Sequence, residues 1–504
     1  MNISIRNCMA LSACLLAAGC SKLSEEDGTQ AQLAHIAVVN QATGVTPFIA
    51  NVALRLEDFT KLENVSFTVA ARPGTFSKPV AVTYTRAWLE RNGAWRAADR
   101  HLALSIFGLY ADYQNSVTIT ARFRDASTHV ERLTVAAPAY TGPAAVYNTP
   151  QVRTARSAAV APGFDYMMVQ NALTTPAVID SDGKLRWVGT GPANSISSLL
   201  KDGAFFVGSA TLPELYRVEF NGSYTTHPLG SPRYTFFHHD FTPGKTGLLA
   251  ELDALEGGVA KVESNLVEIS ATGQVIKEWD LAAIFRAAML AAGDDPSNFV
   301  RDGADWFHMN SAVYVAADDS ILISSREHFV VKLDYASGRI KWLLGDTTKH
   351  WYVDYPSLRA LALKLKSGKA PVGQHSLSIA ANGELLLFNN GLGSLTQPEG
   401  AAPGVTRDFS TPSRYRIDES AGTAIETWSY APDPAIFSDF CSSVYEGAAN
   451  HHLITYSFAD AGTRTKLRAI DSAGKVAFDY DYASTGCAVA FNSKTVDFSD
   501  MTLN

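Results

Sequence analysis

A short pattern of apolar and polar residues recurs along the chain from residue 155 onward. An apolar run ends in a short polar residue, usually Asp, a turn that contains Gly follows, and a second run usually closes on Trp. Asp and Gly at these positions favour reversal of an extended chain, so each copy predicts a β-hairpin. The copies are Ala177 to Trp187, Leu266 to Trp279, Val331 to Trp342, Tyr415 to Trp428 and Leu467 to Val476.

Two further strand-like runs precede a hairpin, as Ser311–Val315 and Ser320–Ser325 precede the copy at Val331. Four strands then form one unit. Unit lengths of roughly 35 to 65 residues, with a weaker copy between Ser195 and Ser231, predict a six-bladed β-propeller. Stacked β-sandwiches would repeat at roughly 100 residues instead. Leu281 to Ala292 has helical spacing and is expected to be an inserted helix.

The chain before the propeller has a different pattern. Residues 33–140 contain alternating runs at the spacing of a small Ig-like β-sandwich. Residues 141–154 are rich in Pro, Gly and Ala and are expected to be a linker, with the propeller over 155–504. The predicted fold class is therefore all-β. The four runs are Val65–Val69, Ala81–Thr85, Ser116–Thr120 and Leu133–Val135.

Composition agrees with a large folded core. Of 504 residues, 46% are hydrophobic and only 18% are charged, which argues against disorder and coiled coils. The net charge of −8 and the sequence pI of about 5.9 provide no general electrostatic attraction for nucleic acid.

The N-terminus predicts export. Residues 1–19 carry one cation and an apolar run too short to span a bilayer. The run resembles a bacterial lipoprotein signal peptide, in which Leu15 to Gly19 form the lipobox and Cys20 is lipidated. An ordinary secretory signal is the alternative. The expected location is the periplasm, with residues 20–32 as a flexible tether and membrane contact only through the lipid anchor.

Two cysteines remain in the expected folded body, Cys441 and Cys487. They can pair in an oxidising compartment or remain buried free thiols, and the sequence does not choose between these states.

Histidines at one phase of the repeat are the main functional signal. His238 and His239, His308, and His375 all precede the first strand of a unit. Because the first strand of each blade lines the central channel, histidines from successive blades are expected to converge at one channel mouth. A single histidine would more often be structural; three at the same phase favour a site.

Arg326 and Asn310 are expected to join the histidines. Arg326 ends the second strand-like run of the unit that contains His308, and its forked donors suit a tetrahedral oxyanion. A surface salt bridge is the structural alternative. Asn310 lies two residues after His308, so regular strand alternation would point both to one side and make Asn310 an extra donor.

The ordered motifs resemble those of bacterial arylsulfate sulfotransferases, over Ala155 to Tyr482. The segment from Phe107 to Tyr110 resembles part of that family's N-terminal Ig-like domain. The motifs include His238-His239-Asp240, Glu263-Ser264-Asn265-Leu266, Asp305-Trp306-Phe307-His308-Met309-Asn310-Ser311, Ser324-Ser325-Arg326, Gln374-His375 and Leu387-Phe388-Asn389-Asn390-Gly391.

The resemblance implies transfer of a sulfuryl group from an aryl sulfate to a phenol, without a cofactor or nucleotide donor. No phosphate-binding GxxxxGK[ST] loop occurs in the sequence. The residue that matches the family's sulfated nucleophile is His375, and the supporting residues fall on His239, with His238 as the adjacent alternative, His308 and Arg326. Charge and composition do not predict a dimer, but the family contains dimers, so the resemblance leaves a homodimer open. Some members carry a disulfide-closed loop before the nucleophile, whereas residues 346–374 contain no cysteine.

Two other classes of function remain open at this stage. The histidines with Asp240 could ligate a transition metal in a hydrolase or oxidoreductase, although Arg326 beside a divalent cation is electrostatically unfavourable. Alternatively, the chain is a non-catalytic binding propeller on the cell envelope, because a fold does not guarantee an activity.

Overall fold

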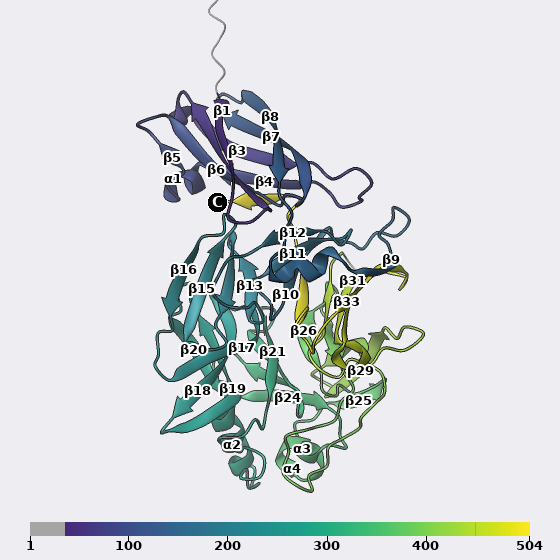
Figure 1. Cartoon of the computed structure of the whole chain (residues 1–504). Helices are drawn as coiled ribbons and strands as arrows, with labels where there is room; N and C mark the ends of the chain where they lie inside the picture. Colours follow the sequence, from purple (N-terminus) through teal and green to yellow (C-terminus); the bar gives the residue numbers. More distant parts are fainter. Residues whose placement is uncertain (1–35, 449) are drawn as a thin grey trace, which may run out of the picture.

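The computed structural model describes residues 36–448 and 450–504, which form a two-sheet N-terminal unit above a ring of six sheets (Figure 1). The signal peptide, Cys20 and the tether therefore lie outside the described residues. Within those residues, no helix is both long and apolar enough to cross a membrane.

The N-terminal unit contains one four-stranded and one five-stranded sheet, in the orders β1-β2-β6-β5 and β35-β4-β3-β7-β8. The four predicted runs all fall in the second sheet, and the Ig-like class of the unit stays a prediction. The strands are β1 Ile36–Thr43, β2 Ile49–Leu56, β3 Leu62–Val69, β4 Val80–Thr85, β5 Trp95–Arg96, β6 His101–Phe107, β7 Tyr113–Phe123, β8 Thr128–Ala137 and β35 Met501–Leu503, with the short helices η1 Phe59–Lys61 and α1 Arg86–Arg91.

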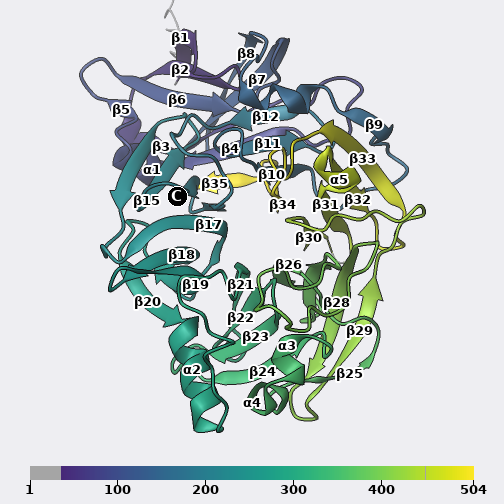
Figure 2. The ribbon, with the colours of Figure 1, turned by 60° about the horizontal axis from the view of Figure 1, so that its bottom comes forward.

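Six sheets form the blades of the propeller, as the repeats predict (Figure 2). From the inner to the outer strand they are β34-β10-β11-β12, β13 to β16, β17 to β20, β21 to β24, β26 to β29 and β30 to β33, here called blades 1 to 6. The first three blades contain β10 Tyr166–Gln170, β11 Ala177–Asp180, β12 Leu185–Val188, β13 Ser198–Lys201, β14 Ala204–Gly208, β15 Glu214–Glu219, β16 Tyr224–Pro228, β17 Tyr234–Pro243, β18 Leu248–Glu256, β19 Val259–Ile269, β20 Val275–Asp280 and β34 Asn492–Val496. The other three contain β21 Met309–Val315, β22 Ser320–Ser325, β23 Phe329–Asp334, β24 Ile340–Gly345, β26 His375–Ile379, β27 Leu385–Asn389, β28 Thr411–Asp418, β29 Thr423–Ser429, β30 Ser443–Glu446, β31 His452–Phe458, β32 Arg464–Ile470 and β33 Val476–Ala483.

Helices are short and peripheral. The inserted helix predicted from Leu281 is α2 Leu281–Ala291, and the Asp280 side chain accepts a hydrogen bond from the Ala283 backbone N–H to cap it. The remaining segments are η2 Pro143–Asn148, α3 His350–Val353, α4 Pro356–Arg359 and α5 Ala459–Gly462, together with the added outer strand β25 Lys364–Ser367.

Where the repeat carries Asp, its side chain closes the hairpin. Oδ1 of Asp180 accepts hydrogen bonds from the backbone N–H groups of Asp182 and Lys184, and Asp471 makes the same pair with Ala473 and Lys475. Such Asx turns stabilise the reversal while a Gly takes the left-handed conformation, as Gly183 does with φ 77°.

The repeated Trp links neighbouring blades. Trp187 of blade 1 donates Nε1–H to the carbonyl of Phe220 in blade 2 at 3.0 Å, and Trp279 of blade 3 donates to the Tyr335 carbonyl in blade 4 at 3.2 Å. In each case the acceptor directly follows the third strand of the next blade. The Trp signature therefore marks contacts between blades as well as packing within a blade.

The ring is closed by strands from both ends of the chain. β34 pairs antiparallel with β10 and becomes the innermost strand of blade 1, while β9 (Gln151–Thr154) pairs with β33 of blade 6. Two boundary predictions need correction. The expected linker 141–154 contains η2 and the blade strand β9, and the last residues of the expected propeller form β35, which pairs with β4 of the N-terminal unit. Sequence composition did not reveal these pairings because the partners are distant along the chain.

The two units share a buried junction. The fully buried Arg186 guanidinium pairs with Asp180 at 3.0 Å, donates two hydrogen bonds to the Gly108 carbonyl and lies 3.7 Å from the Tyr110 ring centroid. Phe107 stacks on Phe220 across the junction. The segment Phe107 to Tyr110 thus joins the N-terminal unit to the propeller.

Candidate functional site

Irregularities in three consecutive inner strands shape the candidate site. The register shifts between Phe237 and Phe241 in β17, between Met309 and Ser311 in β21, and between His375 and Ser378 in β26. Such bulges redirect side chains locally and are common beside active sites. The histidine motifs sit at these three bulges, at the inner edges of blades 3, 4 and 5.

Left-handed backbone conformations gather at the same place. A non-glycine residue in this region costs on the order of 1 kcal/mol or more, so such residues persist where the surroundings require them. The residues with positive φ here are His239 (52°), Glu263 (44°), His308 (51°) and Ser376 (53°). The fold therefore holds these side chains at a local conformational cost.

The structure brings His239, His308 and His375 together. The ring centroid of His239 lies 5.0 Å from that of His308 and 6.4 Å from that of His375. All three are largely buried, and His375 is only 4% exposed. The convergence expected from the shared repeat phase is present in the structure.

His308 is held between two carboxylates and a guanidinium. Its Nδ1 lies 2.6 Å from Asp305 Oδ2 and 2.7 Å from Glu263 Oε2, and its Nε2 lies 3.1 Å from Nη1 of Arg326. Burial lowers the pKa of His308, but Glu263 and Asp305 more than offset this and raise that pKa to about 9.

The two ends of His308 favour different charge states. The carboxylates favour the imidazolium form, whereas Arg326 is a permanent donor that faces Nε2 and favours a neutral, accepting ring. The two carboxylates dominate because both contact Nδ1 at ion-pair distance. Protonated His308 and Arg326 then present two adjacent donors, an arrangement that an anionic oxygen accepting from both would stabilise.

Arg326 is aligned by the residue that follows it. Nε and Nη2 donate to Oε1 of the fully buried Glu327, and the Arg326 backbone N–H donates to the His308 carbonyl. Burial raises the pKa of Glu327, but Arg326 and the hydrogen bonds from the 396–397 segment bring it down to about 2. Glu327 is therefore ionised and orients the guanidinium, while Nη1 remains directed at His308.

Glu263 bridges two of the histidines. Its Oε2 lies 3.2 Å from Nε2 of His239 and 2.7 Å from Nδ1 of His308. Burial opposes its ionisation, but His239, His238 and His308 hold the pKa of Glu263 well below its usual range. Burial lowers the pKa of His239 itself, and Glu263 only partly opposes that effect. The bridge therefore concentrates positive charge on His308.

His375 has a defined hydrogen-bonding side. Nδ1 lies 2.9 Å from Oδ1 of Asn390 and 3.1 Å from the Gly373 carbonyl oxygen, both of which can only accept. Nδ1 must therefore carry the proton. Burial and the neighbouring His239 lower the pKa of His375 well below its usual value, so the ring is neutral near pH 7 with a lone pair on Nε2.

The neighbouring candidates face elsewhere. His238 points at the second strand of its blade, where Nε2 lies 3.3 Å from Asp253 Oδ1, whereas the adjacent His239 faces the cluster. Asn310 is 3% exposed and donates Nδ2–H to the Gln374 carbonyl at 2.8 Å. This bond helps to fix the position of the residue before His375. The role of Asn310 as an extra donor to substrate stays a prediction.

Metal ligation was a further alternative, with Asp240 as one ligand. Asp240 instead accepts hydrogen bonds from Lys494 and Gln170 outside the histidine cluster. Within residues 36–448 and 450–504, two groups of potential ligand atoms lie within 4.8 Å of one another, His238 with His239 and Glu263, and Glu263 with Asp305 and His308. The second group lies against the Arg326 guanidinium, which disfavours a divalent cation there.

Sequence reasoning assigned no site role to three residues that the structure places in contact with the histidines. Glu263, Asp305 and Asn390 each occur in a run that carries the family resemblance. Glu263 lies on the third strand of blade 3, away from the phase at which the histidines recur. A repeat-phase argument could not find it, although a carboxylate inside a family motif was an available signal.

Cys441 and Cys487 form a disulfide, which resolves the open choice between pairing and free thiols. Cys441 precedes β30 in blade 6, and Cys487 lies in the segment that leads to the closing strand β34. The disulfide therefore joins the last blade to the strand that completes the ring, and the Cys441 carbonyl accepts a hydrogen bond from Nδ2 of Asn390.

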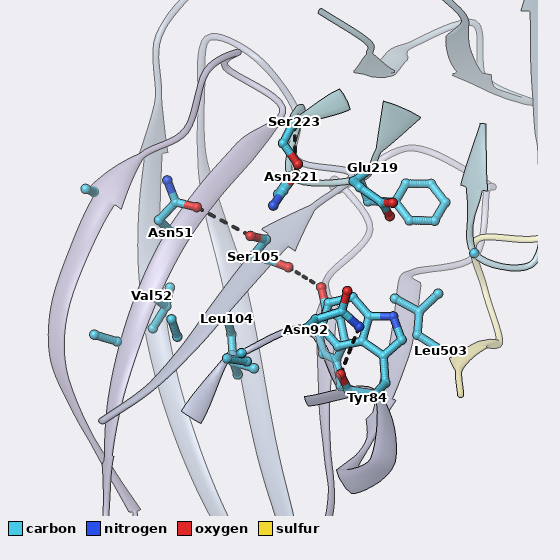
Figure 3. Close-up of a pocket in the computed structure, with 18 of the residues that line it drawn as sticks. Asn51, Val52, Tyr84, Asn92, Leu104, Ser105, Glu219, Asn221, Ser223 and Leu503 are labelled. Atoms are coloured by element: carbon cyan, nitrogen blue, oxygen red, sulfur yellow. Dashed lines mark hydrogen bonds between the residues drawn. The ribbon is translucent and has the colours of Figure 1, made fainter. Parts of the chain in front are cut away.

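A separate cavity of about 500 Å³ lies at the junction of the two units (Figure 3). Tyr84 and Trp88 line it from the N-terminal unit, and Glu219 and Asn221 line it from blade 2. None of its lining residues belongs to the histidine cluster. The perturbed histidines and the guanidinium instead mark the cluster as the place where chemistry is concentrated.

Comparison with known proteins assigns the family. The sequence model of the arylsulfotransferase (ASST) family matches residues 125–492, which include every residue of the cluster. The chain belongs to this family.

Curated arylsulfotransferases match part of the chain. Arylsulfate sulfotransferase AssT of Escherichia coli is 29% identical over 221 residues, which cover 35% of this chain and 36% of that protein. AssT of Lelliottia amnigena is 28% identical over 219 residues, with the same two coverages of 35% and 36%. The aligned stretch thus spans little more than a third of the length of each relative.

Among solved structures, the β-propeller domain of Cps50 (Swd1) from Myceliophteria thermophila covers 67% of this chain and 100% of its own, at 9% identity and a TM-score of 0.35. The six-bladed assignment rests on the strand pairing described above.

Proposed function

We propose that this protein transfers a sulfuryl group from an aryl sulfate ester to a phenol through a covalent intermediate on His375. The observation that carries the proposal is the combination of a neutral His375, with Nδ1–H bound to Asn390, and the adjacent donors His308 and Arg326. Family membership supports the substrate class.

In the first half-reaction, Nε2 of His375 attacks the sulfur of the ester. The N–S bond forms as the bond from sulfur to the aryl oxygen breaks, and the ring gains positive charge while Nδ1–H stays bound to Asn390. The departing phenolate takes the proton from His308, which is held as imidazolium by Glu263 and Asp305. The products are a phenol and sulfated His375.

In the second half-reaction, the acceptor phenol gives its proton to the now neutral His308 as its oxygen attacks sulfur. The N–S bond breaks, which restores neutral His375 and protonated His308. Arg326 donates to the sulfonyl oxygens in both steps, and His239 adds a second imidazole beside them. Because donor and acceptor are both phenolic, one site serves both displacements.

The test is incubation of the purified protein with a chromogenic aryl sulfate, with and without added phenol, followed by intact-mass analysis. Phenol-dependent release of the chromophore and a mass increase of one sulfuryl group are expected. Release that does not depend on phenol would contradict transfer and indicate hydrolysis. Absence of release with several aryl sulfates would favour a binding propeller, and loss of activity with removal of a bound metal would favour metal chemistry.

The pH profile should identify the proton donor. The pKa of His308 is raised to about 9, so its proton is present below that pH and is lost as pH rises through it. Turnover is therefore expected to fall above about pH 9. In Glu263→Gln, loss of one carboxylate lowers the pKa of His308 and should move this alkaline limb to lower pH.

The control for this shift is Glu278→Gln in the same blade, because Glu278 pairs with Arg233 instead of a histidine. Its alkaline limb should coincide with that of the unmodified protein. An unchanged limb in Glu263→Gln would contradict the assignment of His308 as proton donor.

We also propose that the protein is exported to the periplasm and anchored through lipidated Cys20. Labelling of cells with a fatty-acid analogue should mark the protein, and Cys20→Ala should abolish the label while an ordinary secretory signal would leave both proteins unlabelled. A labelled Cys20→Ala variant would contradict the anchor site.

A further inference from the structure

We propose that Asn390 is a positioning residue that sets the tautomer of His375, and this inference rests on the proposed role of His375 as nucleophile. Asn390 directly follows β27 and is fully buried. It would act on the reaction through His375, since its amide contacts the imidazole on the side opposite the reactive Nε2.

The orientation of the Asn390 amide is fixed by its surroundings. Nδ2 donates to the Ser438 carbonyl at 2.8 Å and to the Cys441 carbonyl at 3.0 Å. Carbonyl oxygens only accept, so a flipped amide would place three acceptor oxygens together and lose both bonds. Oδ1 must therefore face Nδ1 of His375, and that contact in turn requires the proton to be on Nδ1.

The support of Asn390 comes from three parts of the ring. The Ser410 hydroxyl lies 2.8 Å from the Asn390 carbonyl oxygen and 3.1 Å from that of Ser438, so it ties these two segments together. Cys441 is in turn held by its disulfide to Cys487. The segment between β29 and β30 thus holds the side-chain amide directly, and Ser410 and the disulfide hold that segment in place.

A neutral amide suits this position better than a carboxylate. During attack on sulfur the ring becomes cationic, and the hydrogen bond from Nδ1–H to Oδ1 strengthens as it does. A carboxylate there would also raise the pKa of resting His375, so that more of the ring would be protonated and unreactive at Nε2. Asn390 provides orientation while leaving the nucleophile neutral.

Two substitutions test the role. Asn390→Leu removes the acceptor at similar volume and should lower kcat about 10- to 100-fold, the range for one hydrogen bond to a developing charge, with little change in KM. The Gly373 carbonyl remains as a second acceptor, so activity should be reduced without being abolished. Asn390→Asp should move the acid limb of the pH profile to higher pH, because a carboxylate stabilises the imidazolium form of His375.

Asn389→Asp is the matched control. Asn389 is equally buried and adjacent, but its side chain bonds to Val372, Ala370 and Tyr415 instead of the His375 ring. It should leave the acid limb in place. A purely structural role for Asn390 would lower the thermal midpoint of its variants without moving that limb.

A measurement on the unmodified protein avoids any problem of folding. The ¹⁵N imidazole shifts of His375, assigned by comparison with His375→Asn, should report the Nδ1–H tautomer; an Nε2–H tautomer would overturn the inference. Wild-type kcat and acid limb in both folded Asn390 variants would also overturn it, provided His375→Asn is inactive. Full turnover by His375→Asn would instead contradict the proposed function, in which His375 is the nucleophile.

Discussion

Replacing His375 by Asn is expected to abolish both the phenol-dependent turnover of an aryl sulfate and the mass increase from the sulfated intermediate. The asparagine amide can still donate to Asn390, but it has no nucleophilic ring nitrogen. Loss of a covalent nucleophile reduces turnover by at least about 10 000-fold in enzymes that depend on one. Initial rates with a chromogenic aryl sulfate and intact mass after incubation without acceptor measure the two effects.

The control is His227→Asn, because His227 lies on the outer strand β16 of blade 2 and contacts Thr225 instead of the cluster. It should keep both turnover and the adduct. Near-normal turnover by His375→Asn, or an undiminished adduct in that variant, would show that the sulfuryl group is carried elsewhere.

The propeller could be predicted from the sequence because its repeating signals are local. Asp180 and Gly183 form their turn within a few residues, and Trp187 recurs because every blade must contact the next. Ring closure lacks a local signal. The pairing of β34 with β10, of β9 with β33 and of β35 with β4 depends on the whole ring being assembled.

The site could be predicted only where residues occupy the same position in successive repeats. This shared position identified His239, His308 and His375, which the structure places together. It could not separate His238 from His239, because both lie inside the bulge between Phe237 and Phe241, where regular alternation of side chains is lost.

Contacts between different strands of the site were beyond sequence reasoning. Glu263 reaches His308 from the third strand of blade 3, and Asn390 reaches His375 from the end of the second strand of blade 5. Neither side chain shares the repeat phase of the histidines. The contacts by which these residues adjust charge and tautomer are therefore visible only once the strands are placed in space.

Arg326→Ala is expected to have the second-largest effect, a loss of about 100- to 1000-fold in kcat, which is the range for removal of one donor to charge that develops in a transition state. The guanidinium of Arg326 belongs to the cluster, because its Nη1 lies 3.1 Å from Nε2 of His308. Arg326→Lys should recover only part of the rate, because an ammonium group lacks the planar fork that contacts Glu327 and His308 together.

A matched control separates chemistry from stability. Arg414 is similarly buried, at 6% exposure compared with 8% for Arg326, and its Nη2 lies 2.9 Å from Nε2 of His452 in the next blade. Arg414→Ala thus removes an equivalent arginine–histidine contact outside the cluster and should lower the thermal midpoint while leaving kcat nearly unchanged.

Glu327 keeps donors from the backbone of Leu395 and Thr396 when Arg326 is removed, so Arg326→Ala should remain folded. Equal losses of kcat in the two variants, measured on folded protein, would mean that Arg326 acts through stability and does not bind the transferred group.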